Sequence, residues 1–440
     1  MHRLFLVALI ACGGPPPASP PTPRAPAATP STNWDRDTAF LELELALPSI
    51  EEKRANMMTS RGIGRKRQIQ LRPAELSATL AAYDPHTAVL LYHRDETELR
   101  VWLIDRSGIA AWAHEPVSSA AIEQAIAALR SALGASTSTN PSGDGTSSRG
   151  LVRVSQPRKL EPRSWREAAR ALRDLVIPGS IRVALQQTQR LMIHPTENIG
   201  TIPFALLPLG GDHRTLIDQM TISITPGVET IGAPVEWDGT FTAPLLVGAP
   251  AWGKHPEYDL DQLPGTRAEV AMIGKRLHAT PLTDASATET SVAQRFSEAD
   301  VVLLATHGTS GGETALDRGF IALAPDGEVA DGWWTPREIQ KARTSARLVV
   351  LSACETGLGR NHAGGVIGLT RAFQLAGASN VIMSLWAVDD AGESRLVDDL
   401  FAAVAHDMPA VALRTAALNA RARGVSPLIW GALAHFGTPQ

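Results

Sequence analysis

Two short runs of apolar residues set the strongest limit on how this chain folds. Residues 301–304 and 348–351 are each an unbroken apolar stretch, which is the pattern of a strand buried inside a sheet. The first run leads to His307, and the second leads through two small residues to Cys354. If the two strands lie side by side, the histidine and the cysteine face each other across one edge of the sheet, where open α/β folds place their chemistry.

A histidine facing a cysteine has the residue types of a nucleophile pair. The imidazole takes the thiol proton, and a nearby imidazolium stabilises the thiolate. Gly308 directly after the histidine lets a substrate carbonyl approach the backbone, so we expect the N–H groups of Gly308 and Cys354 to hold the oxyanion. A lone cysteine is often only a small core residue. The Gly-rich turn at 356–359 and the matching His-Gly strand favour the catalytic interpretation here.

Several motifs occur in an order typical of one protein family. They are a strand followed by His-Gly at 307–308, Ser-Ala-Cys-Glu-Thr-Gly at 352–357, Ala-Gly-Ala-Ser-Asn-Val-Ile-Met-Ser-Leu-Trp-Ala-Val-Asp-Asp at 376–390, Pro-Phe-Ala-Leu-Leu at 203–207 and Leu-Pro-Gly-Thr-Arg-Ala-Glu at 263–269. Over roughly residues 83–437 the chain resembles the CHAT domains, which are caspase-like cysteine peptidases related to separases, caspases and gingipains. No tetratricopeptide repeat, a frequent companion of this family, is visible in the sequence.

The resemblance and the residue pattern imply the same fold class. Strand and helix patterns alternate from Leu191 onward, which favours a three-layer α/β core around a mostly parallel central sheet. The resemblance implies a caspase-like fold with a degenerate N-terminal half, 81–243, and an active C-terminal half, 244–440. We expect strands at 88–92, 99–104, 191–194, 244–248, 300–305, 320–324, 347–351 and 381–385, the last being the last central strand. We expect helices at 122–133, 165–175, 265–277, 335–341 and 364–376.

The resemblance also implies a substrate preference. Residues 386–390 resemble a separase stretch whose last acid helps to bind an arginine on the N-terminal side of the cleaved bond. By position that acid is Asp390, with Asp389 as its neighbour. A carboxylate at the base of a pocket selects arginine through a bidentate, charge-assisted pair. The alternative is that these acids cap the helix that starts near Ala391.

The first residues of the chain predict export. A short basic start is followed by an apolar run, and Leu-Ile-Ala-Cys at 9–12 resembles the lipobox of bacterial lipoproteins, in which Cys12 carries lipid. We therefore interpret 1–12 as a lipoprotein-type signal, 13–33 as a Pro/Ala-rich linker, and 34–80 as a helical N-terminal region before the domain at 81–440. The alternative is a cytoplasmic protein with a disordered Pro-rich tail.

Composition narrows the choice of partners. A net charge of −4 gives no reason to expect nucleic acid as a partner, and no apolar run is long enough to span a membrane. No set of residues has the spacing of metal ligands, so we expect neither a metal nor an organic cofactor. The expected partners are a protein or peptide substrate and, through the lipid on Cys12, a membrane. The sequence names no regulatory partner.

These observations predict a cysteine endopeptidase that uses His307 and Cys354, cleaves after a basic residue, and is anchored by lipid in the periplasm or outer membrane. Two alternatives belong to other classes: an interaction module that keeps the fold without turnover, and a thiol hydrolase that acts on a non-protein amide such as a cell-wall peptide. Residues 308–312 also match Gly-x-Ser-x-Gly, with Ser310 as the serine. That motif needs a helix directly after it, whereas 313–324 has the pattern of a loop and a strand.

Overall fold

The computed structural model describes residues 73–135, 162–211, 214–225, 227–254, 260, 263–309, 319–352, 365–386, 388 and 390–437, together with Leu43. Contacts divide the chain into two units, Met1–Asn33 and Trp34–Gln440. All of the described residues belong to the second unit.

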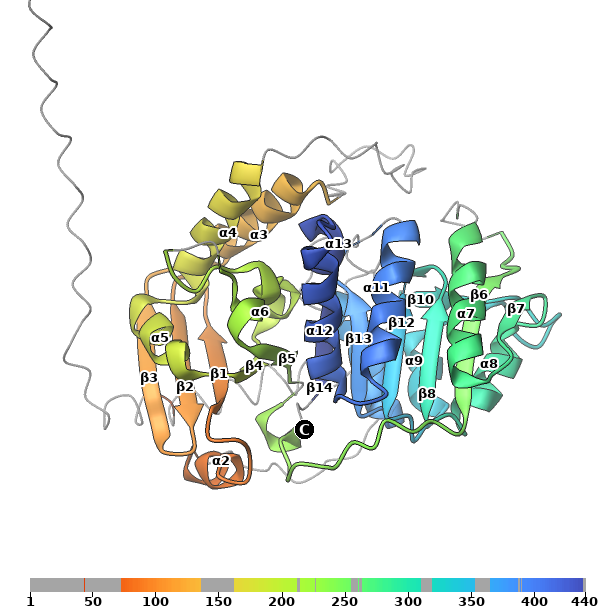
Figure 1. The fold of residues 1–440 in the computed structure, drawn as a ribbon, viewed down its shortest axis with the longest axis horizontal. Helices are drawn as coiled ribbons and strands as arrows, with labels where there is room; N and C mark the ends of the chain where they lie inside the picture. Colours follow the sequence, from red (N-terminus) through yellow and green to blue (C-terminus); the bar gives the residue numbers. More distant parts are fainter. Residues whose placement is uncertain are drawn as a thin grey trace, which may run out of the picture. The chain divides into compact units, whose positions relative to one another are not determined.

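One large sheet organises the described residues, and a small sheet lies beside it. The large sheet has eleven strands in the order β3-β2-β1-β4-β5-β14-β13-β12-β8-β6-β7 (Figure 1), and the small one has the order β11-β10-β9. The strands are β1 (Thr87–Arg94), β2 (Leu99–Asp105), β3 (Gly108–Glu115), β4 (Arg190–His194), β5 (Thr221–Ile224), β6 (Pro244–Pro250), β7 (Leu282–Asp284), β8 (Val301–Ala305), β9 (Gly308–Thr309), β10 (Phe320–Ala322), β11 (Trp333–Trp334), β12 (Leu348–Ser352), β13 (Asn380–Ser384) and β14 (Leu433–Gly437).

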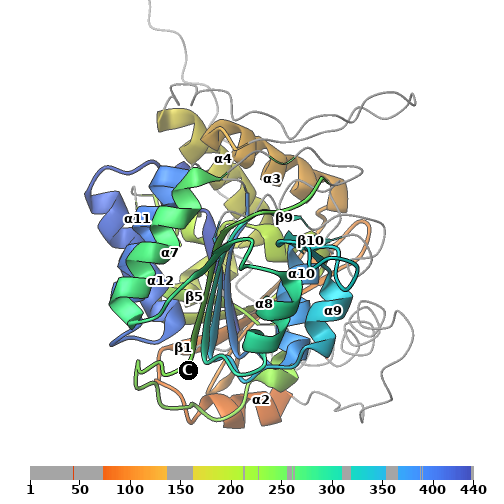
Figure 2. The same ribbon diagram turned by 90° about the vertical axis from the view of Figure 1, so that its right-hand side faces the viewer.

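Helices cover both faces of the large sheet. Figure 2 shows α7, α11 and α12 on one face and α8, α9 and α10 on the other, which gives three layers. The helices are α2 (Pro73–Leu80), α3 (Ser119–Leu133), α4 (Pro162–Val176), α5 (Gly179–Ala184), α6 (Leu216–Gln219), α7 (Pro264–Leu277), α8 (Glu289–Phe296), α9 (Pro336–Lys341), α10 (Gly365–Ala376), α11 (Asp390–Ala403), α12 (Pro409–Ala422) and α13 (Pro427–Trp430). Among the residues that the structure describes, no helix has the length and hydropathy of a membrane span.

Parallel pairing dominates the sheet because its central strands are apolar on both faces. Every residue of β8, β12 and β13 is buried, as the unbroken apolar runs in the sequence indicated. Only β1–β2, β2–β3 and β13–β14 pair antiparallel; the other neighbours in the large sheet are parallel. The helices packed on each face then complete the core.

The expectation that residues 381–385 form the last central strand is wrong. Strand β14 follows it in the chain and lies between β13 and β5, in the middle of the sheet. It pairs antiparallel with β13 and, through Phe436 and Ile224, parallel with β5. The expected halves 81–243 and 244–440 are therefore joined in one continuous sheet, and β14 is the strand that joins them.

A buried histidine holds this central strand. His435 on β14 is 2% exposed; its Nδ1 lies 2.9 Å from Ser223 Oγ on β5, and its Nε2 lies 2.9 Å from Asn380 Oδ1 on β13. The Asn380 amide nitrogen donates to the carbonyl of Arg347, so its oxygen is the acceptor and Nε2 carries the proton. Desolvation lowers the pKa of His435 to about 3, and the ring stays neutral.

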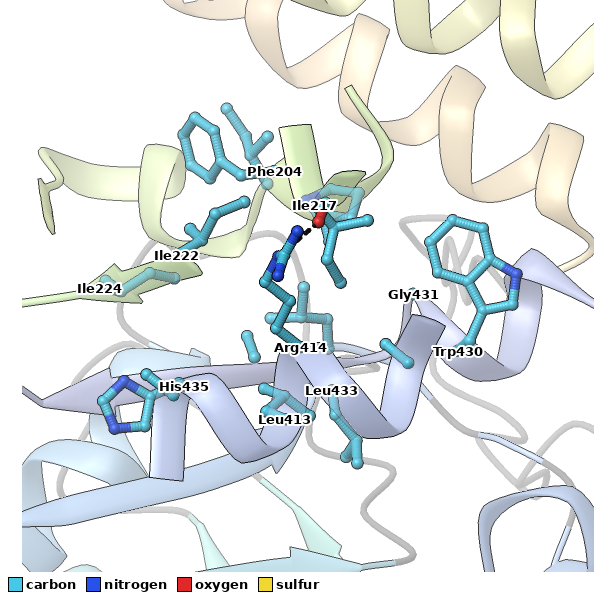
Figure 3. A pocket seen from close by; sticks show the side chains of 17 residues that line it. Phe204, Ile217, Ile222, Ile224, Leu413, Arg414, Trp430, Gly431, Leu433 and His435 are labelled. Carbon is cyan, nitrogen blue, oxygen red and sulfur yellow. Dashed lines mark hydrogen bonds between the residues drawn. The ribbon is translucent and has the colours of Figure 1, made fainter. Parts of the chain in front are cut away.

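A cavity of about 40 Å³ lies along the same seam (Figure 3). Its walls come from both sides of the seam, with Ile222 on β5 facing Leu413 on α12 and Leu433 on β14. Arg414 also lines it, and its guanidinium donates to the backbone carbonyls of Ile217 and Asp218 at 2.7 and 2.8 Å. The lining is otherwise mostly apolar, and its residues come from both halves of the sheet.

The segment between β5 and β6 leads into the amino end of β6. It therefore lies at the edge of the sheet opposite to the carboxyl ends of β6 and β8. Trp237 donates its indole N–H to the carbonyl of Val404 at 2.8 Å, and the guanidinium of Arg347 lies 4.4 Å from the Trp237 ring centroid. Arg347 also pairs with Asp238 at 2.8 Å. These contacts tie the connecting segment to the amino end of β12.

His435 makes the stability of the protein depend on pH. In the unfolded chain this imidazole takes up a proton near pH 6.5, whereas in the folded protein it does so only near pH 3. The unfolded state therefore binds more protons in this window, and the free energy of unfolding falls by up to about 1.4 kcal/mol for each unit that the pH drops. We expect His435→Gln to remove this part of the slope in urea unfolding between pH 6.5 and 4. An unchanged slope in the variant would contradict the assignment.

Candidate functional site

Four neighbouring strands end at one edge of the sheet. Strands β6, β8, β12 and β13 are mutually parallel, with Gly248 and Ser352 both opposite Ala305 and with Leu351 opposite Met383. The carboxyl ends of parallel strands meet at the same edge, so the segments that follow these strands converge there. Every residue that the sequence predicts to act on substrate follows β8, β12 or β13.

The structure describes part of this predicted set. His307 and Gly308 are described and lie at the shared edge, directly after β8. Asp390 is the first residue of α11, and its side chain is not described. Cys354, Asp389 and Cys12 lie outside the described residues, as does Ser310. Their roles, including the lipid anchor, stay predictions from the sequence.

His307 is held through its backbone. The residue is 6% exposed, and the N–H of Ala322 donates to its carbonyl oxygen at 2.8 Å. The hydroxyl of Thr306 donates to the carbonyl of Ala322 at 2.7 Å. Strand β10 of the small sheet therefore fixes the position of the chain on both sides of the histidine.

The same pairing fixes the direction of the Gly308 N–H. Gly308 lies opposite Ile321, and the hydrogen bond from Ala322 to His307 flanks that pair. Gly308 and Ile321 are therefore a non-hydrogen-bonded pair, in which the backbone groups of both residues point away from the partner strand. The N–H of Gly308 thus faces away from β10.

An aromatic residue that sequence reasoning missed packs on the histidine. The half-buried indole of Trp252 meets the His307 ring edge to face, with centroids 5.0 Å apart and planes at 76°. Trp252 follows β6, the neighbour of β8 in the sheet. In the sequence, Trp252 comes just after the apolar strand pattern at 244–248. Like residues 301–304, that strand belongs to the parallel core.

A buried carboxylate supports the small sheet. Glu289, at the start of α8, accepts the N–H of Gly332 at 3.1 Å, and Gly332 in turn accepts the N–H of Leu323 just after β10. Burial is the main cause that raises the pKa of Glu289 to about 7, and the negative charges of Glu338 and Asp331 add to it. Sequence reasoning missed this residue, because its burial depends on the fold of the β10–β11 region.

Within the described part of the chain, no cluster of three or more His, Cys, Asp or Glu residues is arranged to hold a metal ion.

Comparison with known proteins gives the family. The family model described as the CHAT domain matches residues 166–438. The chain belongs to the CHAT domain family. This family is related to the caspase-like cysteine peptidases, and the resemblance seen in the motifs is thereby confirmed.

Two relatives and two solved structures are similar to this CHAT domain protein. Tetratricopeptide repeat protein 28 of Mus musculus is 25% identical over 324 residues, covering 62% of this chain and 13% of that protein. Its counterpart of Homo sapiens is 23% identical over 256 residues, covering 48% and 10%. The chain thus spans only about a tenth of the length of these relatives.

Two crystal structures of the separase–securin complex of Saccharomyces cerevisiae are similar in fold. Both are 11% identical; one covers 83% of this chain and 31% of the other at a TM-score of 0.50, and the second covers 93% and 34% at 0.52. At this identity they show the fold alone. The predicted caspase-like α/β fold with a mostly parallel central sheet is confirmed.

The unusual pKa of Glu289 gives a test of the small sheet. The folded protein keeps the Glu289 proton up to about pH 7, whereas the unfolded chain loses it near pH 4.5. The folded state therefore binds more protons in this window, and the free energy of unfolding falls as the pH rises through it. We expect Glu289→Gln to be more stable than the native protein in urea at pH 8 and to lose this dependence. The exposed Glu298, just after the same helix, gives the control Glu298→Gln. If both variants follow the native pH dependence, the account of Glu289 is wrong.

Proposed function

We propose that this chain is a cysteine endopeptidase of the caspase-like clan, with Cys354 as nucleophile and His307 as general base and acid. The observation that carries the proposal is the register of β8 and β12. Ala305 lies opposite Ser352, and His307 and Cys354 each follow two residues after these partners. The burial of His307 at the shared edge and the membership of the CHAT family support the same assignment.

The chemistry follows from these two residues. The imidazole of His307 accepts the thiol proton, and the thiolate sulfur attacks the carbonyl carbon of the scissile peptide bond. The tetrahedral oxyanion then collapses as the C–N bond breaks, and the imidazolium gives its proton to the leaving amine. Water, deprotonated by the same imidazole, hydrolyses the thioester that remains and restores the thiol.

The direction of the Gly308 N–H supports its role as an oxyanion donor. This N–H group points away from β10, so it does not form a hydrogen bond to that strand. The second donor in the proposal is the N–H of Cys354. Each preorganised donor of this kind is typically worth 10²–10³ in rate in peptidases of other folds.

Removal of either member of the pair tests the proposal. We expect Cys354→Ala and His307→Gln in the full 440-residue chain to lower kcat/KM at least about 10³-fold on a fluorogenic peptide library, because nucleophile and base are each lost. The library varies the residue before the cleaved bond. Ser310→Ala is the matched control and keeps full activity, since the serine of the Gly-x-Ser-x-Gly match has no role here.

The outcomes separate the alternative functions. Turnover on wall fragments but not on peptides, lost in Cys354→Ala, would assign a thiol hydrolase of a non-protein amide. If the native protein cleaves none of the substrates, and both Cys354→Ala and His307→Gln still bind protein ligands, the protein would be an interaction module. Activity that survives in Cys354→Ala contradicts the proposal outright.

We further propose that the enzyme prefers arginine before the cleaved bond and that Asp390 binds it. Asp390 begins α11, the helix that follows β13 from the shared edge of the sheet. Glu393, three residues later on α11, is 1% exposed and adds a second acidic residue to this turn. Asp389, the residue before Asp390 in the sequence, is the neighbouring acid in the same proposal.

Asp390→Asn tests the charge of this pocket. Asparagine caps helices as well as aspartate does, so the substitution keeps any capping role and removes only the charge. We expect kcat/KM for arginine substrates to fall about 10- to 100-fold, and that for substrates with a neutral residue there to change little. An equal loss on both substrate sets would assign Asp390 to the structure of α11 rather than to arginine.

A further inference from the structure

The contact between Trp252 and His307 comes from two strands that would not meet this way if both ran straight. Gly248 on β6 lies opposite Ala305 on β8. His307 comes two residues after Ala305, whereas Trp252 comes four residues after Gly248. At about 3.3 Å per residue, a straight β6 would carry Trp252 some 6–7 Å past the level of the histidine. The rings instead lie 5.0 Å apart.

A bulge at the end of β6 takes up one residue, which is about half of this difference. Gly248 lies opposite Thr283 and Pro250 opposite Asp284, so Ala249 is an extra residue in β6. Ala249 has a φ of 45°, in the left-handed region that a residue with a Cβ rarely adopts. Bulges of this kind bend a strand and re-aim the side chains that follow it.

Thr266 holds the bulge in place. This residue is 1% exposed, and its hydroxyl accepts the N–H of Ala249 at 3.0 Å while donating to the carbonyl of Leu263 at 2.7 Å. A Cβ on Gly248 would lie 2.8 Å from the carbonyl oxygen of Thr266, so the strand and α7 are in close contact here. Thr266 belongs to the Leu-Pro-Gly-Thr-Arg-Ala-Glu motif, to which the proposed chemistry assigns no other task.

We infer that Trp252 is a positioning residue for the His307 imidazole, and that Thr266 sets the position of Trp252 through its hydrogen bond to the bulge at Ala249. This inference rests on the proposed function for its effect on catalysis. The contact itself and its dependence on Thr266 do not need that function.

The physical effect is a restriction of ring orientation. An edge-to-face contact with the indole favours one range of imidazole orientations and keeps water from one side of the ring. A general base must lie within hydrogen-bond reach of the proton that it takes, so a ring with a wider range of orientations spends less time in the productive geometry. Loss of Trp252 therefore lowers the rate of the chemical step and leaves substrate binding largely intact.

The experiment uses two matched pairs in the full chain. Trp252→Leu removes the ring, whereas Trp252→Phe keeps an aromatic edge. Thr266→Val keeps the shape but removes the hydroxyl, whereas Thr266→Ser keeps the hydroxyl. Trp237→Leu is the control, because this half-buried indole also has an edge-to-face partner, Phe241, and lies at the opposite edge of the sheet.

Two readouts are measured on each variant. The first is kcat and KM on a cleaved peptide, and the second is the ¹H NMR signal of the His307 ring, identified by its absence in His307→Gln. We expect Trp252→Leu and Thr266→Val to lower kcat about 3- to 10-fold with KM within about twofold. We expect both to shift the ring signal. Trp252→Phe and Thr266→Ser recover most of the native kcat, and Trp237→Leu changes neither readout.

Each contrary result has one meaning. A rise in KM with kcat unchanged would assign Trp252 to substrate binding and overturn the positioning role. A native ring signal in Thr266→Val would overturn the role of Thr266. If the native protein cleaves no peptide, the proposed function fails, and the ring signal alone decides the inference: a shift in both variants supports it, and no shift overturns it.

Discussion

The register of three buried strands is the constraint on which the candidate site depends. Strands β6, β8 and β12 are apolar on both faces, and each fully buried Val or Leu contributes roughly 1.5–3 kcal/mol whichever face it occupies. Such strands do not fix their own register. Asp300 contacts the segments before the other two strands at their amino ends: its backbone N–H donates to the carbonyl of Ala243, its carbonyl accepts the N–H of Arg347, and its carboxylate accepts the hydroxyl of Thr242. The pairing continues in register from there to the edge where His307 lies.

The sequence predicted the elements that carry a one-dimensional signal. The apolar runs of β8, β12 and β13 and the helical spacing of α3, α4 and α7 are each visible in a short window, and the structure has elements at all six places. The sequence also placed His307 just after a buried strand, where the structure has it, whereas its catalytic role stays a prediction. The position of Cys354 was predicted equally clearly, but it lies outside the described residues and stays a prediction.

The features that sequence reasoning missed depend on contacts between distant segments. Strand β14 contains a polar His435 and looks unlike a core strand until Ser223 and Asn380 are brought to its ring. The sequence shows that Trp252 follows an apolar strand, but it does not show the contact with His307, because that partner lies after another strand and a bulge bends the chain between β6 and Trp252. A residue pattern records how a segment alternates, and neither a partner strand nor a bulge leaves a mark in that alternation.

The position of β14 also bears on how the two halves act together. A strand from the carboxyl end of the chain completes the sheet between β5 and β13, so the strands that lead to the candidate site share one hydrogen-bonded sheet with the N-terminal half. The side chain of His435 bonds to both neighbours of β14 and stays neutral in doing so. The first half therefore supports the second through the sheet itself as well as through its helices.

The most direct test of the central claim is covalent labelling. The full chain would be treated with a peptidyl ketone that ends in arginine and reacts with activated thiols, and the adduct would be located by mass spectrometry. The account predicts one adduct, on Cys354, that forms far more slowly in His307→Gln and is blocked by an arginine peptide. Equal labelling in the native protein and in His307→Gln, or no labelling of Cys354, would contradict the claim that the two aligned strands bring a histidine and a cysteine into one catalytic pair.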